Sequence, residues 1–285
     1  MITRFTSRFS VELAPQMALL SALLLICYFP MLRITASLLM ASDDMAHGVA
    51  APLIAAYIVW EKRALFFSLP VKPSAAGLGL IVLASFAGVI AAAGGSTTFS
   101  RCAFLVSLAG ALLATGGWAF LKPFLFPISL LIFTFPVPFA LYSELTLPLQ
   151  LLASRWSQSV MELAGLTVFR TGNVLHLAHR TLSVAEACSG LKSLITLSFF
   201  CIVYAYFLET RASIRAVILL AAPLAAIALN VIRIALTGIL SKAHPEITSG
   251  FYHELLGWLC LGLGVAMVVA AHRISRWIIV RQEAV

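Results

Sequence analysis

The chain has 285 residues, of which 61% are hydrophobic and 11% are charged, and its mean hydropathy is +1.02. A soluble domain of this composition could not cover its surface with polar groups, so the composition excludes a soluble globular protein and indicates a polytopic membrane protein. The net charge of +8 does not indicate a nucleic acid partner, because the basic residues occur singly or in pairs at the ends of apolar runs. The expected environment is the lipid bilayer.

Eight apolar runs approach the length of about 20 residues that crosses a bilayer. They cover residues 13–32, 46–60, 75–94, 102–121, 123–141, 190–208, 215–240 and 251–272. We therefore predict an all-α polytopic membrane protein of about eight transmembrane helices, in a single integral membrane domain over residues 1–285. The first run follows Arg4 and Arg8, as in a signal peptide, but no clear small-x-small cleavage site follows it, so we expect an uncleaved helix.

Basic residues are unevenly distributed between the short connections. With the N-terminus inside the cell, the inner segments hold Arg4, Arg8, Lys62, Arg63, Lys72, Lys122, Arg211, Arg215, Arg273, Arg276 and Arg281. The short outer connections hold only Arg33, Arg101 and Lys242. This bias predicts that both termini are cytoplasmic.

The long outer segment, about 142–189, has its own pattern. Residues 147–165 alternate apolar and polar side chains at helical period, which predicts an amphipathic helix in the membrane interface. Residues 167–170, 174–177 and 181–184 are typical of short strands joined by tight turns. This small β element leads the chain to Cys188. Pro127, Pro136, Pro138 and Pro148 predict kinks or a broken helix before it.

Cys188 stands in a setting that suits a nucleophile. It lies between Glu186 and Lys192, beside Gly190 and just before an apolar run, and thiolates form at such partly exposed, charge-bearing positions. Glu186 is expected to orient His253, to pair with Arg233 or simply to solvate the loop.

The other four cysteines have no polar company in the sequence. Cys27, Cys102, Cys201 and Cys260 all lie inside apolar runs, so we expect structural roles as small buried hydrophobes. An odd number of cysteines leaves at least one thiol free.

Arg233 lies inside a predicted span, where an arginine is costly and usually faces the bundle interior or a cavity. Asn230, Arg233 and Thr237 share one helix face at positions i, i+3 and i+7. Counted from Arg215, Arg233 is about 27 Å along the helix, close to the outer leaflet. The alternative is an arginine that snorkels to the outer headgroups.

Two histidines are expected at the same outer level. His253 precedes Gly257 and Trp258 at the start of the last run, and it can serve as the base or proton donor that a thiol nucleophile needs. His47 follows two acidic residues, and we expect it to hold structure or position substrate.

No metal or cofactor site is predicted. His176 and His179 are spaced H-x-x-H on a turn-rich segment without further ligands. The sequence has no GxGxxG, Walker or HExxH motif. Acyl exchange at a thiol would need neither ATP nor a metal.

These motifs together resemble the exosortase group of the exosortase/archaeosortase family. The resemblance is carried by Glu-Ala-Cys-Ser-Gly-Leu-Lys-Ser at 186–193, by Asn230 with Arg233, and by His253 with Gly257 and Trp258. Ala46-His47-Gly48 and the proline-containing stretch 135–152 add weaker similarity. Lys192 stands where arginine is common in the family, and Ala46 where serine is common.

The resemblance implies a cysteine transpeptidase-like enzyme, a thiol protease, of the Gram-negative inner membrane with its active site facing the periplasm. Its substrates would be membrane-tethered proteins with a C-terminal sorting signal of the PEP-CTERM type. By motif, Cys188 would be the nucleophile, and Arg233 and His253 would complete the site. The supporting or substrate-binding residues would be Glu186, Ser189, Gly190, Lys192, Asn230 and His47.

Two other functions fit part of the pattern. A membrane transporter or assembly scaffold could use Arg233 to bind an anion, but it would leave Cys188 without a role. A thioester-forming acyltransferase would share the chemistry of Cys188 and differ in its substrate.

Overall fold

The structure, a computed structural model, describes residues 2–41, 45–184 and 190–283. The chain divides into two compact units, Met1–Pro138 and Phe139–Val285. Cys188, Glu186 and Ser189 lie outside the described residues.

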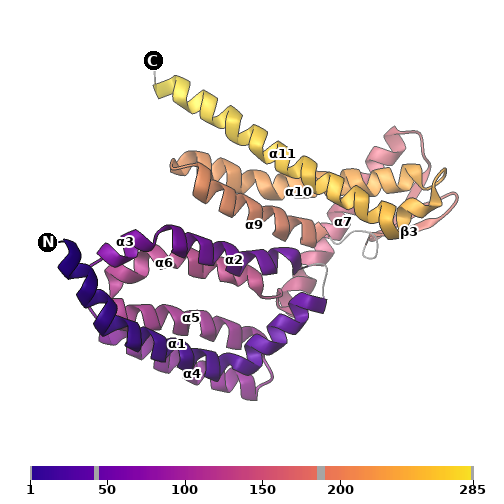
Figure 1. The fold of residues 1–285 in the computed structure, drawn as a ribbon. Helices are drawn as coiled ribbons and strands as arrows, with labels where there is room; N and C mark the ends of the chain where they lie inside the picture. Colours follow the sequence, from indigo (N-terminus) through magenta and orange to yellow (C-terminus); the bar gives the residue numbers. More distant parts are fainter. Residues whose placement is uncertain (1, 42–44, 185–189, 284–285) are drawn as a thin grey trace. The chain divides into compact units, whose positions relative to one another are not determined.

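Unit 1 is built from helices in two layers (Figure 1). The elements are α1 (Ile2–Ala41), α2 (Ala46–Glu61), α3 (Arg63–Ser68), α4 (Ala75–Ala93), α5 (Thr97–Gly116), α6 (Trp118–Leu130) and the 3₁₀ helix η2 (Leu131–Thr134). One layer holds α1, α4 and α5, and the other holds α2, α3 and α6. Gly77 and Gly110 let the backbones of α4 and α5 approach closely, as small residues do in membrane helix pairs.

Gly117 divides an apolar run that the sequence predicted as one helix. Its φ of +79° lies in the left-handed region, and the carbonyl oxygen of Lys72 occupies the place of a Cβ. The Lys72 amide also donates to the Gly116 carbonyl at 3.1 Å. Because only glycine fits this conformation and this close approach, the run 102–121 forms two helices rather than one.

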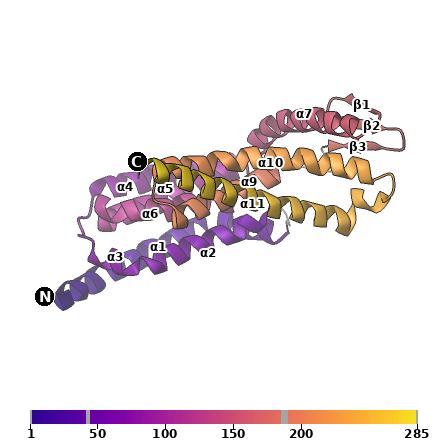
Figure 2. The same cartoon turned by 90° about the horizontal axis from the view of Figure 1, so that it is seen from above.

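Unit 2 combines four longer helices with a small sheet (Figure 2). The elements are α7 (Phe139–Leu163), β1 (Val168–Thr171), β2 (Val174–Leu177), β3 (Thr181–Ser183), α9 (Gly190–Leu208), α10 (Ala212–Leu240), η3 (Pro245–Thr248) and α11 (Gly250–Glu283). The predicted strands are confirmed within one residue. The predicted amphipathic helix forms the larger part of α7.

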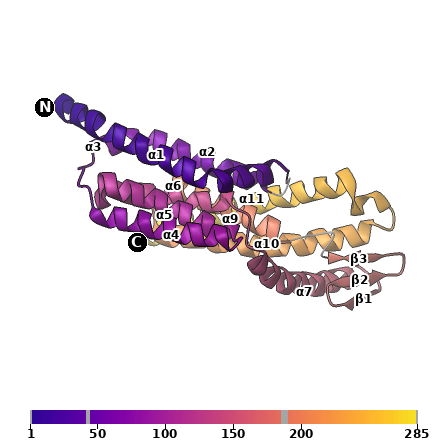
Figure 3. The ribbon, with the colours of Figure 1, turned by 90° about the horizontal axis from the view of Figure 1, so that it is seen from below.

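The sheet is an antiparallel meander in the order β1-β2-β3, with Val168 opposite Leu177 and His176 opposite Thr181. It lies beside α7 and the C-terminal part of α10 (Figure 3). Leu175 and Val184 pack into a cluster that also contains Met161 of α7 and Ile234 of α10. The Ser157 hydroxyl, on α7, donates to the Val231 carbonyl at 3.0 Å. The meander is therefore packed against α7 and α10 as far as Val184.

The predicted fold class is confirmed, with fewer spans than the eight expected. Among the described residues, six helices are long and apolar enough to cross a membrane: α1, α4, α5, α9, α10 and α11. The pair Trp118–Thr134 and Phe139–Leu163 would make a seventh, but it bends by 77°. α2 has only 16 residues, and the run 123–141 is broken before Phe139 at the predicted prolines.

The distribution of charges placed Arg101 in an outer connection, and this prediction is wrong. Arg101 lies in the second turn of α5 and is only 4% exposed. Its Nε donates to the Thr35 hydroxyl on α1 at 3.4 Å, and its guanidinium lies 5.9 Å from the Phe135 ring centroid. α5 begins before the apolar run because a buried partner on α1 makes the arginine tolerable there.

A buried polar cluster joins the ends of α9, α10 and α11. Glu209, between α9 and α10, accepts the amides of Thr210 and Arg211 at 2.8 and 2.9 Å. Its other oxygen lies 3.2 Å from Nε2 of His272, whose Nδ1 is 2.9 Å from the Tyr204 hydroxyl. The Arg211 amide is the largest of the interactions that hold the pKa of Glu209 below its ordinary value.

Replacing Glu209 by glutamine is expected to lower the stability of the protein in detergent micelles by about 1.5–3 kcal/mol at neutral pH, because a charged hydrogen-bond network is lost. Since the folded-state pKa of Glu209 is lowered, this contribution is present above the unfolded-state pKa and disappears as the pH falls through the folded value. Thermal unfolding curves of both proteins at neutral and acidic pH measure the effect.

The matched control is Glu246→Gln. Glu246 is exposed and lies 3.1 Å from the likewise exposed His244, so its replacement should leave the stability of the protein essentially unchanged. A difference between wild type and Glu209→Gln that stays constant down to acidic pH would contradict the assignment.

Candidate functional site

The face of α10 that carries Asn230 and Arg233 forms a polar centre against α11. Nη2 of Arg233 lies 3.5 Å from Nε2 of His253, in the first turn of α11. A guanidinium can only donate hydrogen bonds, so in this contact Nε2 accepts and the ring proton is on Nδ1. The sequence prediction that Arg233 and His253 converge is therefore seen directly.

Nδ1 of His253 is buried and has no hydrogen-bond partner within the described ranges. A buried donor without a partner costs free energy unless something else satisfies it. With Nε2 directed to Arg233, Nδ1 is the ring atom through which His253 can exchange a proton with a substrate group.

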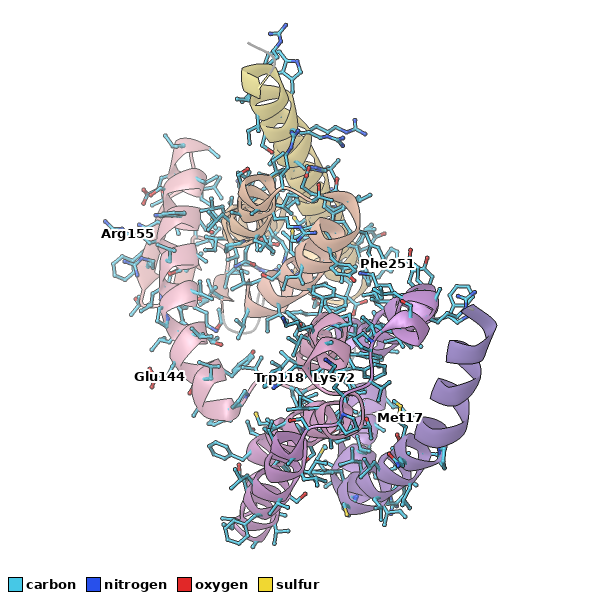
Figure 4. The ribbon with its side chains drawn as sticks, turned by 90° about the vertical axis from the view of Figure 1, so that its left-hand side faces the viewer. Met17, Lys72, Trp118, Glu144, Arg155 and Phe251 are labelled. Carbon is cyan, nitrogen blue, oxygen red and sulfur yellow. The ribbon has the colours of Figure 1, made fainter. Side chains whose placement is uncertain are left out.

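The Arg233 guanidinium lies against α11 at Gly257. A Cβ built at Gly257 would be 3.4 Å from Nη1 of Arg233. Six and five residues before Gly257 on α11, Phe251 and Tyr252 are exposed, as expected for side chains at a membrane interface. Phe251 is labelled in Figure 4. Glu144 and Arg155, also labelled there, point outward from α7.

Asn230 connects the polar face of α10 to the start of α9. It is 7% exposed, and its Nδ2 lies 2.8 Å from the position that a Cβ on Gly190 would take. Its Oδ1 has no hydrogen-bond partner among the described residues. Thr237 completes the predicted stripe, but it is fully buried one turn beyond Arg233.

A narrow pocket opens beside these groups. Its volume is about 270 Å³ including the mouth, and little of that space is wide enough for a water molecule. The lining comprises Ser193, Leu197, Ala226, Leu229, Asn230, Arg233, Cys260, Leu261 and Gly264. Its polar groups come from α9 and α10, and the remaining wall is apolar.

Cys260 corrects the expectation for the four other cysteines, because it lines this pocket together with Asn230 and Arg233. It lies seven residues after His253, two turns along the same face of α11, and that spacing was the available signal. Cys201 is fully buried in an apolar cluster, as predicted. Cys27 and Cys102 are exposed on α1 and α5 rather than buried.

The remaining predicted residues are distributed over the fold. Lys192 is exposed in the first turn of α9. His47 lies in the first turn of α2, in the other unit. His176 and His179 have different partners, the hydroxyls of Thr181 at 3.5 Å and Ser241 at 2.9 Å. No group of three His, Cys, Asp or Glu side chains in the described ranges is arranged to hold a metal ion.

Replacing Gly190 by alanine is expected to reduce substrate processing by roughly 10- to 100-fold, because the buried Asn230 amide must move aside. Alanine favours helix more than glycine does, so the variant should remain folded. Processing per amount of folded enzyme measures the effect. Gly262→Ala on α11 is the control, since nothing lies within 4 Å of its Cβ position. Equal activity of wild type, Gly190→Ala and Gly262→Ala would show that the contact between Gly190 and Asn230 does not matter for processing.

The long apolar helices and the arginine–histidine contact define an α-helical multi-pass membrane protein with a polar centre in its second unit. The family model described as Transmembrane exosortase (Exosortase_EpsH) matches residues 35–270, and the chain therefore belongs to that family. The match confirms the resemblance predicted from the motifs. No curated protein and no solved structure is detectably similar to the chain.

Family membership supports an enzyme at a general level. Exosortases are cysteine transpeptidase-like membrane enzymes that act on proteins. Asn230, Arg233 and His253 lie within the matched residues, and they bring a cation and a histidine together.

Proposed function

We propose that the protein is a membrane-embedded cysteine protease and transpeptidase, with Cys188 as nucleophile and Arg233 and His253 as its partners. The observation that carries the proposal is the Arg233–His253 contact on a face whose Asn230 reaches the first residue of α9. Cys188 precedes that residue by two positions, and two residues span at most about 7 Å of chain. The thiol is thus proposed at this end of the polar face.

In the proposed reaction, the Cys188 thiolate attacks the carbonyl carbon of a substrate peptide bond. In this state His253 is an imidazolium, because Nε2 has taken the proton of the Cys188 thiol and Arg233 has turned from Nε2 to the thiolate. A carbon–sulfur bond forms, the carbon–nitrogen bond breaks, and the leaving amine takes the proton from Nδ1 of His253. The resulting thioester is then resolved by an amine, a lipid hydroxyl or water, whose proton passes to His253.

Arg233 is proposed to hold the thiol deprotonated and to stabilise the oxyanion that develops on the carbonyl oxygen. A planar guanidinium can direct two hydrogen bonds at once. Nδ1 of His253, which has no hydrogen-bond partner among the described residues, supports a role in proton transfer. Glu186, Ser189, Gly190, Lys192, Asn230 and His47 are proposed as supporting or substrate-binding residues.

The proposed substrates are membrane-tethered proteins with a C-terminal sorting signal of the PEP-CTERM type, cleaved at the periplasmic face of a Gram-negative inner membrane. The basic inner connections support this orientation, with both termini cytoplasmic. A reporter placed after Pro70 should then be cytoplasmic and one near Gly172 external. Reporters on the same side would contradict it.

Mass spectrometry of a trapped adduct tests the reaction. Incubation with substrate followed by rapid denaturation should leave on Cys188 an acyl group whose mass equals that of the cleaved substrate fragment. The experiment is best done with Cys260→Ser, since Cys260 lines a pocket together with Arg233 and offers a second thiol. Processing without any adduct on Cys188, under conditions where hydrolysis is slowed, would exclude Cys188 as the nucleophile. The absence of both processing and adduct would favour the transporter or scaffold function.

A further inference from the structure

A large apolar pocket lies in unit 1, and its lining contains no described residue of unit 2. It opens between the two helix layers, with α1 and α5 on one side and α2, α3 and α6 on the other (Figure 1). Its volume is about 1330 Å³ including its open side. Helices α1 and α2 make few contacts with each other. The space between the two layers is therefore not closed by direct packing of α1 against α2.

The walls of the pocket are apolar and well fixed. Leu108 and Leu112 come from α5, and Phe120 and Phe124 come from α6. Phe124 stacks on Phe66 of α3 with the ring centroids 4.1 Å apart, and its centroid is 5.2 Å from that of Phe120. Arg63 is the only charged residue of the lining. Water would find almost no hydrogen-bonding partner inside, so the walls suit a hydrocarbon chain.

The mouth of the pocket has the opposite character. Arg63 and Trp60 line it, with the Arg63 guanidinium 4.6 Å from the Trp60 ring centroid and its Nη1 donating to the Trp60 carbonyl at 2.7 Å. Both side chains are exposed, as expected where a helix leaves the hydrocarbon core. Arg63 is thus held at the rim with its charge facing the headgroup level.

Further cations lie at this end of unit 1. Lys62 adjoins Arg63, Lys122 is exposed in the second turn of α6, and Lys72 is bonded through its backbone to the turn before α6. Figure 4 looks onto this end and labels Met17 of the pocket lining, Lys72 and Trp118. A cationic rim around an apolar pocket is complementary to one amphiphile, an anionic lipid.

We propose that this pocket binds an anionic phospholipid of the inner leaflet, with an acyl chain between the two layers and the phosphate at Arg63. A lipid here would fill the space between α2 and α5 and stabilise unit 1. The proposal is independent of the chemistry at Cys188. Selectivity for anionic over zwitterionic lipid comes from Arg63, since each cation near a membrane surface favours anionic lipid by about 1 kcal/mol, which is about fivefold.

Native mass spectrometry of the purified full chain tests the site, with added phosphatidylglycerol or phosphatidylcholine of the same acyl chains. During delipidation, the wild-type protein is expected to retain one phosphatidylglycerol molecule under conditions that remove all phosphatidylcholine. Arg63→Gln should lower the preference for phosphatidylglycerol about fivefold. Ala56→Phe, which fills the pocket from α2, should remove retention of both lipids.

Matched controls separate the site from general effects. Arg276→Gln removes an exposed cation of α11, and Ala92→Phe adds the same bulk on an exposed face of α4; both should retain lipid as wild type does. A photoactivatable phosphatidylglycerol should crosslink to peptides of α2 and α6 and not do so in folded Ala56→Phe. Equal retention of the two lipids by wild type, lipid binding unaffected by Ala56→Phe, or a peptide as the retained species would overturn the proposal.

Discussion

Replacing Cys188 by alanine is expected to abolish substrate processing, with a loss of more than about 1000-fold, while membrane insertion and yield stay unchanged. Without the sulfur no thioester can form, and the other residues of a catalytic group retain little activity when the nucleophile is gone. Loss of the sorting-signal fragment on immunoblots, normalised to the folded enzyme, measures the effect. Equal processing by wild type and variant would remove Cys188 from the mechanism.

Cys201→Ala is the matched control, because it makes the same change at a fully buried thiol in an apolar cluster. It should process substrate like wild type, although the small cavity can lower stability. Cys260→Ser provides a second comparison beside Arg233. Since no step of the proposed reaction uses its sulfur, most activity should remain.

The sequence predicts the fold well where periodicity alone determines the element. The β2 strand at Val174–Leu177 and the helices Gly190–Leu208 and α10 follow directly from strand spacing and apolar length. The prediction from sequence fails where a single backbone contact determines where a helix ends. The break at Gly117 depends on the Lys72 carbonyl, which approaches from a residue 45 positions earlier in the chain, so hydropathy carries no sign of it.

The convergence of Arg233 and His253 could be predicted because both lie at one end of adjacent spans once the chain is threaded across a bilayer. Asn230 was found from its spacing to Arg233. Cys260 was missed because an apolar run was taken to mean an apolar environment, whereas the environment of a helical residue depends on its face. The buried contacts of Arg101 with α1 and of Glu209 with α11 were also missed, because long-range partners are not visible in a linear pattern.

The replacement Arg233→Lys keeps a positive charge on a long apolar stem but removes the planar fork of donors. If Arg233 only snorkels to headgroups, lysine should serve about as well. The structure speaks against that alternative, because the side chain packs over Gly257 and reaches His253 instead of extending away from α11. A point-charge ammonium cannot give directed hydrogen bonds to a thiolate and an oxyanion together.

Arg233→Lys is therefore expected to insert and fold normally, to bind substrate, and to lose about 100- to 1000-fold in the rate of processing, the usual cost of one missing oxyanion donor. Single-turnover rates with saturating substrate separate this loss from weaker binding. Arg276→Lys, an exposed position on α11, is the control and should be fully active. If the Arg233→Lys enzyme kept most of its turnover, Arg233 would be an anchor in the membrane interface, and the oxyanion would have to be stabilised by other donors, with the Asn230 amide the first to test.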